Sequence, residues 1–292
     1  MLIGVECISA ISTGHVTAID PATAVTWPVD IDSEHFPDDQ FRAYASQYFD
    51  ADKDGTLSES EADAVTKISI TSKTISSLKG VEYFRNLTQL LAWNNQLSSL
   101  DVSHNPRLKE LDVEGDELTS LDVSHNEQLK YLDVDRSSLP SLDVSHNVQL
   151  PTLYATDNQL SSLDVSVNRH LTSLCVDGNR LSSLDVSKNM KLKVLRLWSN
   201  RLPALDLSAN ARLTECSSAM QRVTFAAMKS PDGTMTVSMK RAGIDPSRVS
   251  GVSAGMFDAS TGVVTFSESE TVQGFSYRYD TKTPEGVTWI AA

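Results

Sequence analysis

Cysteine, aromatic residues and long apolar runs are all scarce in this chain of 292 residues. The three cysteines (Cys7, Cys175 and Cys216) are too few and too scattered for a disulfide framework or a thiolate metal site. Aromatic residues make up only 7% of the chain, within a hydrophobic fraction of 40%, so a core must consist mainly of aliphatic side chains. No run reaches the ~18–20 apolar residues that cross a bilayer, so we expect no membrane insertion.

Basic residues are also few relative to acidic ones. The chain carries 25 Lys and Arg against 38 Asp and Glu, a formal net charge of −13. Nucleic acid and anionic membranes are bound through basic surfaces, so neither is expected as a partner. An excess of carboxylates favours cations and basic partners instead.

The N-terminal flank, residues 1–28, has no clear role. Residues 2–11 are fairly apolar, but Glu6 interrupts them, and no Lys or Arg precedes Arg42. A secretory signal places basic residues before its apolar stretch, which this flank does not do. We leave this segment unassigned.

An internal repeat dominates the middle of the chain. Six consecutive copies of a 21-residue pattern, LxxLxVxxNxLxSLDVSxNxx, follow one another without insertion, and a seventh begins at Leu213. The six copies begin at Leu87, Leu108, Leu129, Leu150, Leu171 and Leu192. Val65 to Leu78 keep the same apolar spacing in a 22-residue variant. Such a run in phase has a negligible risk of arising by chance.

Each copy contains two short segments whose apolar and polar residues alternate, the pattern of extended chain. In the second copy the apolar set is Leu108, Leu111, Val113, Leu118, Leu121 and Val123. One coil cannot bury this set, but coils stacked about 4.8 Å apart can. The repeat therefore predicts a leucine-rich repeat solenoid over 65–220, a β-rich coil with two extended faces and little helix.

Asparagine recurs at the second turn of every coil. The six positions are Asn105, Asn126, Asn147, Asn168, Asn189 and Asn210. An inward amide can satisfy turn backbone groups that would otherwise be buried without partners. The first turn is less regular, with Asn95, Asp116, Ser137, Asn158, Asn179 and Asn200.

The repeat resembles the nested 21-residue class of bacterial leucine-rich repeats called IRREKO, with the consensus LxxLxLxxNxLxxLDLxxNxx. More broadly, the chain is similar to internalin-like surface proteins of bacteria. The match covers about residues 65–216. The resemblance implies a right-handed solenoid that is used for binding.

Residues 50–61 have the ligand spacing of a 12-residue calcium loop. Their sequence is DADKDGTLSESE, with Gly55 at the sharp turn. The predicted calcium ligands are Asp50, Asp52, Asp54, the carbonyl of Thr56, Ser58 and Glu61. The loop follows an amphipathic pattern from Phe41 to Phe49 and resembles a single EF-hand or dockerin-type site. We therefore predict a structural calcium ion in a helix–loop–helix cap over 29–64.

A second interpretation of the same loop is compatible with the first. Ser58 and Glu61 have the spacing of a capping box for the following helix, with the aspartates as solvated turn formers. Capping alone does not need three alternating aspartates and a glycine, which favours calcium.

The composition changes after the repeats. Short clusters of β-forming residues alternate with turn signals such as Pro231-Asp232-Gly233. We predict that 221–292 form a β-rich C-terminal cap or an immunoglobulin-like subdomain, similar to those that close internalin-type arrays.

The two extended faces differ in how much they vary between coils. The second face repeats one aspartate and one serine in every coil, for which we expect coil-to-coil hydrogen bonding. A cation ladder or an acidic docking stripe is the alternative. The first face varies, with an acidic centre flanked by aromatic residues, as in a binding hot spot. The predicted ligand-binding residues are Trp93, Glu110, Asp112, Glu114, Tyr131, Asp133, Asp135, Tyr154, Arg196 and Trp198. Mere variation of a soluble surface is the other interpretation.

No catalytic motif is present in the sequence. There is no HExxH, no phosphate loop and no serine elbow, and the aspartates recur with the coil instead of forming a singular pair. We predict a non-enzymatic, monomeric recognition or adhesion module of a bacterium, secreted or on the cell surface, that binds an extracellular protein or glycan. The alternatives are a non-catalytic targeting domain of a larger surface enzyme and a structural spacer.

Overall fold

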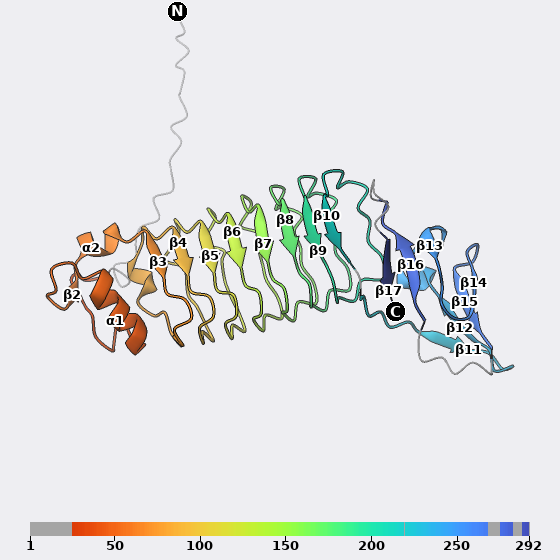
Figure 1. Cartoon of the computed structure of the whole chain (residues 1–292), viewed down its shortest axis with the longest axis horizontal. Helices are drawn as coiled ribbons and strands as arrows, with labels where there is room; N and C mark the ends of the chain where they lie inside the picture. The colour runs from red at the N-terminus through yellow and green to blue at the C-terminus, as the bar shows by residue number, and fades with distance from the viewer. Residues whose placement is uncertain (1–24, 219, 268–274, 283–287, 292) are drawn as a thin grey trace, which may run out of the picture.

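The computed structural model describes residues 25–218, 220–267, 275–282 and 288–291. It shows an elongated β-solenoid with a helical cap at its N-terminal end and small antiparallel sheets at its C-terminal end (Figure 1). The predicted fold class, a leucine-rich repeat solenoid with little helix, is confirmed. Most of the unassigned N-terminal flank, residues 1–24, lies outside the described residues. Within the described parts of the chain, no helix has the length and apolar character needed to span a membrane.

One parallel sheet of eight strands runs along the solenoid in the order β10-β9-β8-β7-β6-β5-β4-β3. Each strand has three residues and pairs with the strand one coil away, 21 residues apart between β4 and β10 and 22 residues apart between β3 and β4. The strands are β3 (Lys67–Ser69), β4 (Gln89–Leu91), β5 (Glu110–Asp112), β6 (Tyr131–Asp133), β7 (Thr152–Tyr154), β8 (Ser173–Cys175), β9 (Val194–Arg196) and β10 (Glu215–Ser217).

The core is the column of aliphatic side chains that the repeat places inward. Leu108, Leu111, Val113, Leu118 and Val123 have no exposed surface, and their equivalents in the other coils are also buried. Burying each such side chain contributes about 1.5–3 kcal/mol, and the contact partners belong to the neighbouring coil. A further inward position is less covered, because Leu121 and its equivalents Leu100 and Leu184 are only partly buried.

The two predicted extended faces differ in how their coils pair. Among the described residues, the second face contains no named strand, and its only recorded bridge joins Asp101 to Asp122. The predicted coil-to-coil bonding of the aspartates is wrong, because each carboxylate accepts from the serine N–H two residues later in its own coil. These local turns provide hydrogen-bond partners for the aspartate carboxylates and the serine N–H groups without pairing between coils.

The asparagines of the second turn form a continuous ladder, as predicted. Nδ2 of Asn126 donates to the carbonyls of Val102 (2.9 Å) and Asn105 (3.0 Å) in the preceding coil. The same pair of bonds recurs in all six coils, and all six amides are fully buried. We call this series the second-turn ladder.

A second ladder lies inside the first turn, and it is interrupted. Asn158 Oδ1 accepts from the N–H of Leu139, while its Nδ2 donates to the carbonyl of Val134. Asn95, Asn179 and Asn200 bond in a similar way, and Gln221 ends the series by accepting from the N–H of Leu202. Asp116 and Ser137 occupy the remaining places. We call this series the first-turn ladder.

The turn beside this ladder contains a residue in the left-handed region in every coil. These residues are Asn94, Gly115, Arg136, Asp157, Gly178 and Ser199, with φ between 52° and 73°. At Gly115 a Cβ atom would lie 2.2 Å from Oδ1 of Asn94, so a side chain there would clash with the preceding coil. Glycine thus relieves both the backbone angle and the crowding at this turn, whereas four of the equivalent turns hold the same angle with a larger residue.

The N-terminal cap consists of β1 (Val29–Asp30), α1 (Asp39–Tyr48), β2 (Thr56–Leu57) and α2 (Glu59–Ala64). The two strands pair antiparallel, so the loop after α1 is held against the segment before α1. Asp38 caps α1 with one carboxylate oxygen and accepts from Ser76 of the solenoid with the other. A short 3-10 helix, Val81–Tyr83, follows in the first coil.

The described residues of the C-terminal region form two small antiparallel sheets, in the orders β11-β12-β15-β14 and β13-β16-β17. The strands are β11 (Ala227–Lys229), β12 (Met235–Ser238), β13 (Val249–Ser250), β14 (Met256–Asp258), β15 (Val263–Phe266), β16 (Tyr277–Asp280) and β17 (Thr288–Ala291). Two 3-10 turns, Lys240–Ala242 and Pro246–Arg248, lie between them.

The C-terminal sheets are fastened to the last coil by polar contacts. The hydroxyl of Tyr277 donates to the carbonyl of Pro203 (2.7 Å), and the N–H of Leu207 donates to the carbonyl of Thr281 (3.0 Å). Arg248 pairs with Asp206 and lies over the ring of Tyr279. These contacts cover the apolar end that a solenoid would otherwise expose.

Candidate ligand face and metal loop

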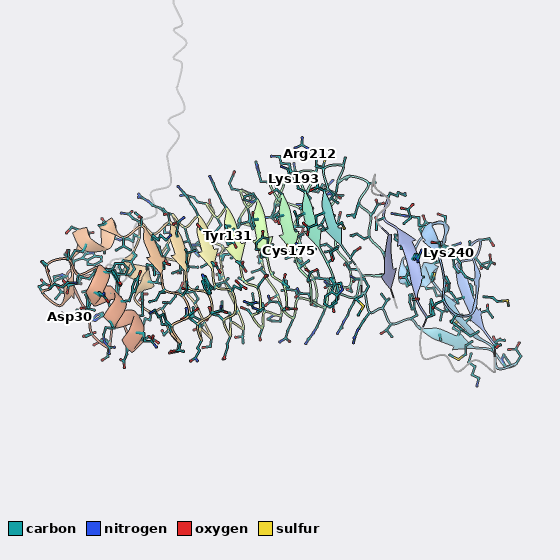
Figure 2. The ribbon with its side chains drawn as sticks, viewed as in Figure 1. Asp30, Tyr131, Cys175, Lys193, Arg212 and Lys240 are labelled. Atoms are coloured by element: carbon teal, nitrogen blue, oxygen red, sulfur yellow. The ribbon has the colours of Figure 1, made fainter. Side chains whose placement is uncertain are left out.

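The outer face of the long sheet presents the residues that vary between coils. Along each coil the first and third strand residues, and the residue two positions further, point away from the core, because their neighbours Leu90 and Ala92 and the equivalents of these are buried. Figure 2 shows Tyr131 and Cys175 on this sheet, in the middle of the solenoid. The structure therefore brings the predicted ligand-binding residues onto one surface.

The acidic centre comprises Glu110, Asp112, Glu114, Asp133 and Asp135, on the coils of β5 and β6. Carboxylate oxygens of Asp112, Glu114 and Asp133 lie within 4.8 Å of one another. Among the described residues, the one recorded ion pair of this group joins Glu114 to Arg136. The acidic centre thus carries more negative charge than its neighbours balance.

Asp133 differs from its prediction as an exposed ligand contact. Only 5% of its surface is exposed, and its side chain is hydrogen-bonded to Tyr131. Its Oδ2 accepts from the hydroxyl of Tyr131 (3.0 Å), and its Oδ1 accepts from the N–H of Asp135 (3.0 Å). Asp133 therefore supports the surface and adds charge to it, but offers little of itself to a partner.

Burial and mutual repulsion make these carboxyls weak acids. Burial, followed by the charges of Asp133, Glu114 and Glu110, raises the pKa of Asp112 to about 6. Burial and the charge of Asp133 raise the pKa of Asp135 to about 7. A positive group placed against this surface would favour the ionised forms and relieve the repulsion.

Aromatic side chains flank the acidic centre. The rings of Tyr131 and Tyr154 meet edge to face, with centroids 5.7 Å apart. Trp93 is half-buried, and Trp198 is 45% exposed. Five strand spacings separate the two tryptophans, which is about 24 Å at about 4.8 Å per spacing. A ligand that contacts both must be extended.

Arg196, another predicted contact, is already paired. Its guanidinium binds the carboxylate of Glu215 on β10, with Nε 2.7 Å from Oε1. Arg136 and Glu215 were not predicted as parts of this face. Their coil positions show that they are near it, but the ion pairs depend on long side chains whose direction the repeat does not fix.

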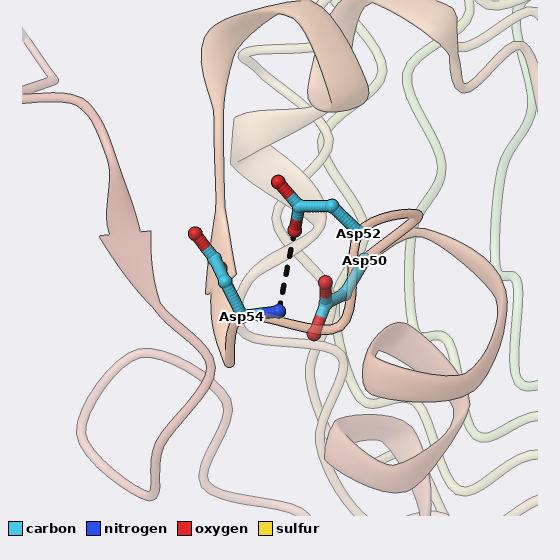
Figure 3. A group of neighbouring side chains, drawn as sticks. All are labelled: Asp50, Asp52 and Asp54. Atoms are coloured by element: carbon cyan, nitrogen blue, oxygen red, sulfur yellow. Dashed lines mark hydrogen bonds between the residues drawn. The ribbon is translucent and has the colours of Figure 1, made fainter.

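The metal loop, residues 50–61, brings three of its predicted ligands together. Carboxylate oxygens of Asp50, Asp52 and Asp54 lie within 4.8 Å of one another in the loop between α1 and β2 (Figure 3). Oδ2 of Asp50 accepts from the N–H of Gly55 (3.1 Å), and Oδ1 of Asp52 accepts from the N–H of Asp54 (3.2 Å). Gly55 has a φ of 88°, as the sharp turn requires.

The capping box predicted for Ser58 and Glu61 is confirmed at the start of α2. Oε2 of Glu61 accepts from the N–H of Ser58 (2.9 Å), and Oε1 accepts from the N–H of Ala51 (2.6 Å) at the beginning of the loop. Thr56 donates to Asp54 through both its N–H and its hydroxyl. Glu61 thus closes the loop, next to the three aspartates but outside their immediate cluster.

Comparisons with known proteins point to one kind of fold. No family model matches the chain. Internalin C2 from Listeria monocytogenes has a crystal structure that superposes with a TM-score of 0.57 and 18% identity, over 69% of this chain and 92% of that chain. The fold is that of a leucine-rich repeat solenoid. At this identity the likeness shows the fold alone.

A sequence relative supports the same resemblance. Internalin J from Listeria monocytogenes is 32% identical over 73 residues, which is 25% of this chain. The matched part spans only 8% of the length of Internalin J. The solved functional domain of InlJ aligns over 90% of this chain and 98% of that chain, but with 15% identity and a TM-score of 0.29, which supports no structural argument. The repeats are therefore internalin-like in sequence over a short stretch and in fold.

Proposed function

We propose that this chain is a non-enzymatic recognition or adhesion module that binds an extracellular protein or glycan through the outer face of β4–β9. One observation carries the proposal: an acidic centre with few balancing cations lies between partly exposed aromatic side chains on a varied sheet surface. Aromatic anchors and unbalanced charges are the features that concentrate binding energy at protein surfaces.

The electrostatics of this face favour binding over acid–base chemistry. A catalytic carboxyl pair needs environments that push the two pKa values apart, so that one group donates a proton while the other accepts it. Here burial raises the pKa of Asp112, Asp133 and Asp135 alike. These groups share one environment and one direction of shift, which suits a charged docking surface.

The same geometry indicates what kind of partner fits. The span of about 24 Å between Trp93 and Trp198 suits an extended macromolecule better than a small ligand. The excess of carboxylates around Asp112 and Glu114 favours a partner with Lys or Arg side chains, for which charge complementarity provides specificity and fast association. Of the two partner classes, a protein with a basic segment therefore fits this face better than a neutral glycan.

The proposed location, secreted or on the surface of a bacterium, rests on the resemblance to internalins. A rigid solenoid offers a preorganised surface, so little ordering cost opposes the binding of a large partner. We propose that the chain acts as a monomer.

The test begins with an array of extracellular proteins, basic peptides and glycans probed with the whole chain. Binding to the strongest protein ligand is then measured for two variants, Trp93→Ala/Trp198→Ala and Asp112→Asn/Asp135→Asn. Both aspartates use one oxygen to accept a backbone N–H, which asparagine retains, so the fold is preserved. We expect each variant to bind at least about tenfold more weakly, a loss of about 1.4 kcal/mol.

A matched control removes the same charge from the second face. In Asp143→Asn/Asp164→Asn the side chains still accept from the N–H groups of Ser145 and Ser166. Its affinity should stay close to that of the unmodified chain. If both outer-face variants bind as tightly as this control, the proposed face is wrong.

A further inference from the structure

A second site, far from the outer sheet face, involves a buried carboxylate with an unused oxygen. Asp50 has only 2% of its surface exposed, and its Oδ1 atom has no hydrogen-bond partner. Leaving a buried polar oxygen unsatisfied costs about 1–3 kcal/mol, and more for a charged group. The position of Asp50 among Asp52 and Asp54 makes the cost larger, because like charges surround it.

Within the part of the chain that the structure describes, no ion pair compensates for this charge. Lys53 lies within the loop, but its Nζ donates to the carbonyls of Ser46 (2.7 Å) and Gln47 (2.9 Å) at the end of α1. Among the described residues, none of the recorded ion pairs involves Asp50, Asp52 or Asp54. The loop therefore holds several oxygens close together with a vacant acceptor at its centre.

We propose that residues 50–61 bind one calcium ion and that this ion fastens the N-terminal cap to the first coil of the solenoid. The ligands are Asp50, Asp52, Asp54, the carbonyl of Thr56, Ser58 and Glu61, all oxygen donors, as a hard cation prefers. This site is separate from the outer sheet face, so it goes beyond the proposed recognition function.

The loop is prepared for an ion by its own hydrogen bonds. Gly55 and Asp54 donate their N–H groups to the aspartates that precede them, which fixes the directions of those carboxylates. Glu61 spans the loop to Ala51, so its carboxylate already lies at the loop entrance. Pairing of β2 with β1 holds the second half of the loop in extended conformation. An ion would therefore bind to a largely preformed site.

Contacts on the far side of the loop connect it to the solenoid. After the loop, Glu59 of α2 pairs with Arg85 (2.9 Å), and the carbonyl of Asp63 accepts from Asn86 (2.9 Å). Before the loop, the ring of Phe49 meets the ring of Phe84, with centroids 4.8 Å apart. Because each coil is stabilised by its neighbour, an ion that orders the cap also stabilises the first coil.

The first experiment titrates the calcium-free whole chain with calcium chloride by isothermal calorimetry and follows thermal unfolding with and without the ion. We expect one ion per chain, a dissociation constant below about 1 mM, and a Tm that rises by several degrees at saturating calcium. Magnesium should bind more weakly, because it requires a smaller octahedral site. Absence of both heat and Tm shift would overturn the proposal.

Two substitutions separate calcium binding from helix capping. Glu61→Gln keeps the capping box, which accepts either residue at this place, but removes one charge from the site and the acceptor for the N–H of Ala51. Asp50→Asn keeps an acceptor for the N–H of Gly55. Each should weaken calcium binding at least tenfold, whereas Asp143→Asn/Asp164→Asn should bind calcium normally. The calcium-free Tm should be unchanged or higher in Asp50→Asn and slightly lower in Glu61→Gln. Unchanged calcium affinity in Asp50→Asn would contradict the site.

Hydrogen exchange tests the connection to the solenoid. Calcium should slow exchange most at the amides of β3 and β4, less at β6, and least at β9 and β10, because stabilisation passes from one coil to the next. The same gradient should be missing in Asp50→Asn. Equal slowing along the whole sheet would show that the ion does not act through the first coil.

Discussion

The two turns of each coil differ in how a buried side chain satisfies the backbone groups around it. The second-turn ladder has asparagine in all six coils, whereas the first-turn ladder contains asparagine, aspartate, serine and glutamine. In the second turn only Nδ2 is used, and the Oδ1 atoms of all six asparagines have no partner. In the first turn both ends of the amide are used, as in Asn158.

This difference explains which substitutions each ladder contains. Asp116 still accepts the N–H of Leu97 with Oδ1, so it retains the acceptor half of the amide. Its Oδ2 is buried without a partner, at the place where asparagine has a donor. Ser137 is too short to act as the acceptor or as the donor of the amide, and its hydroxyl also has no partner. The second turn depends on the Nδ2 donor alone, so neither aspartate nor serine could replace asparagine there.

The two defects lie in the coils that carry the acidic centre. Asp116 follows β5 and Ser137 follows β6, the strands of Asp112 and Asp133. The unpartnered polar atoms of the first-turn ladder therefore lie in the same coils as the acidic centre of the outer face. The second-turn ladder is uniform and acts as the scaffold. Three substitutions test this difference between the two ladders, in order of expected effect.

The largest effect is expected from breaking the second-turn ladder. Asn147→Ala removes the side-chain donor that serves the carbonyls of Val123 and Asn126, so each carbonyl keeps only its backbone partner, the N–H of Asn126 or of Leu129. The free energy of unfolding should fall by about 1–3 kcal/mol for the two lost hydrogen bonds, measured by urea denaturation. A loss below about 0.5 kcal/mol would show that the ladder contributes little and that the comparison of the two turns is wrong.

A smaller, opposite effect is expected from repairing the first-turn ladder at Asp116. Burial raises the pKa of Asp116 to about 6, so the protonated carboxyl favours the folded state. This stabilisation is lost as the pH rises through about 6, because the buried carboxyl then ionises. Asp116→Asn restores the donor and removes the charge. It should raise the free energy of unfolding by about 1–2 kcal/mol at about pH 8, and the gain should shrink toward about pH 3, where the carboxyl is mostly protonated in both states.

Urea denaturation of both proteins across this pH range checks the prediction. A gain that is independent of pH would mean that the missing donor, and not the charge of Asp116, limits stability.

The smallest of the three effects is expected at Ser137. Ser137→Asn would supply an acceptor for Leu118 and a donor for the carbonyls that the equivalent Asn158 serves in the next coil. The melting temperature should rise, with a gain of about 1 kcal/mol for the added hydrogen bonds after the cost of fitting a larger side chain. Ser137→Ala is the matched control, because it fills no vacancy and should leave the stability nearly unchanged.

The repeat alone predicts most of the solenoid, because a period of 21 residues fixes which side chains meet between coils. Leu111 and Val123 are buried as predicted, and the second-turn asparagines bond as expected. The capping box at Ser58 and Glu61 follows from spacing in the same way. These features depend on contacts that are local or that recur exactly.

Other features depend on contacts that the repeat does not encode. Asp133 is buried and bonded to the hydroxyl of Tyr131 from its own strand, which alternation alone does not reveal. On the second face the aspartates bond locally to serine instead of supporting a continuous sheet, and the spacing of the repeat is compatible with either arrangement. Gln221 lies beyond the regular copies, yet its longer side chain completes the first-turn ladder.

Every bond of the second-turn ladder reaches back to the preceding coil and no further. A complete 21-residue unit could therefore be removed or duplicated, and the new neighbours would again present matching carbonyls and amides. The caps at either end would meet unchanged coils. The length of the outer face, and with it the size of the partner that it spans, can thus vary by whole units while the contacts between neighbouring coils stay the same.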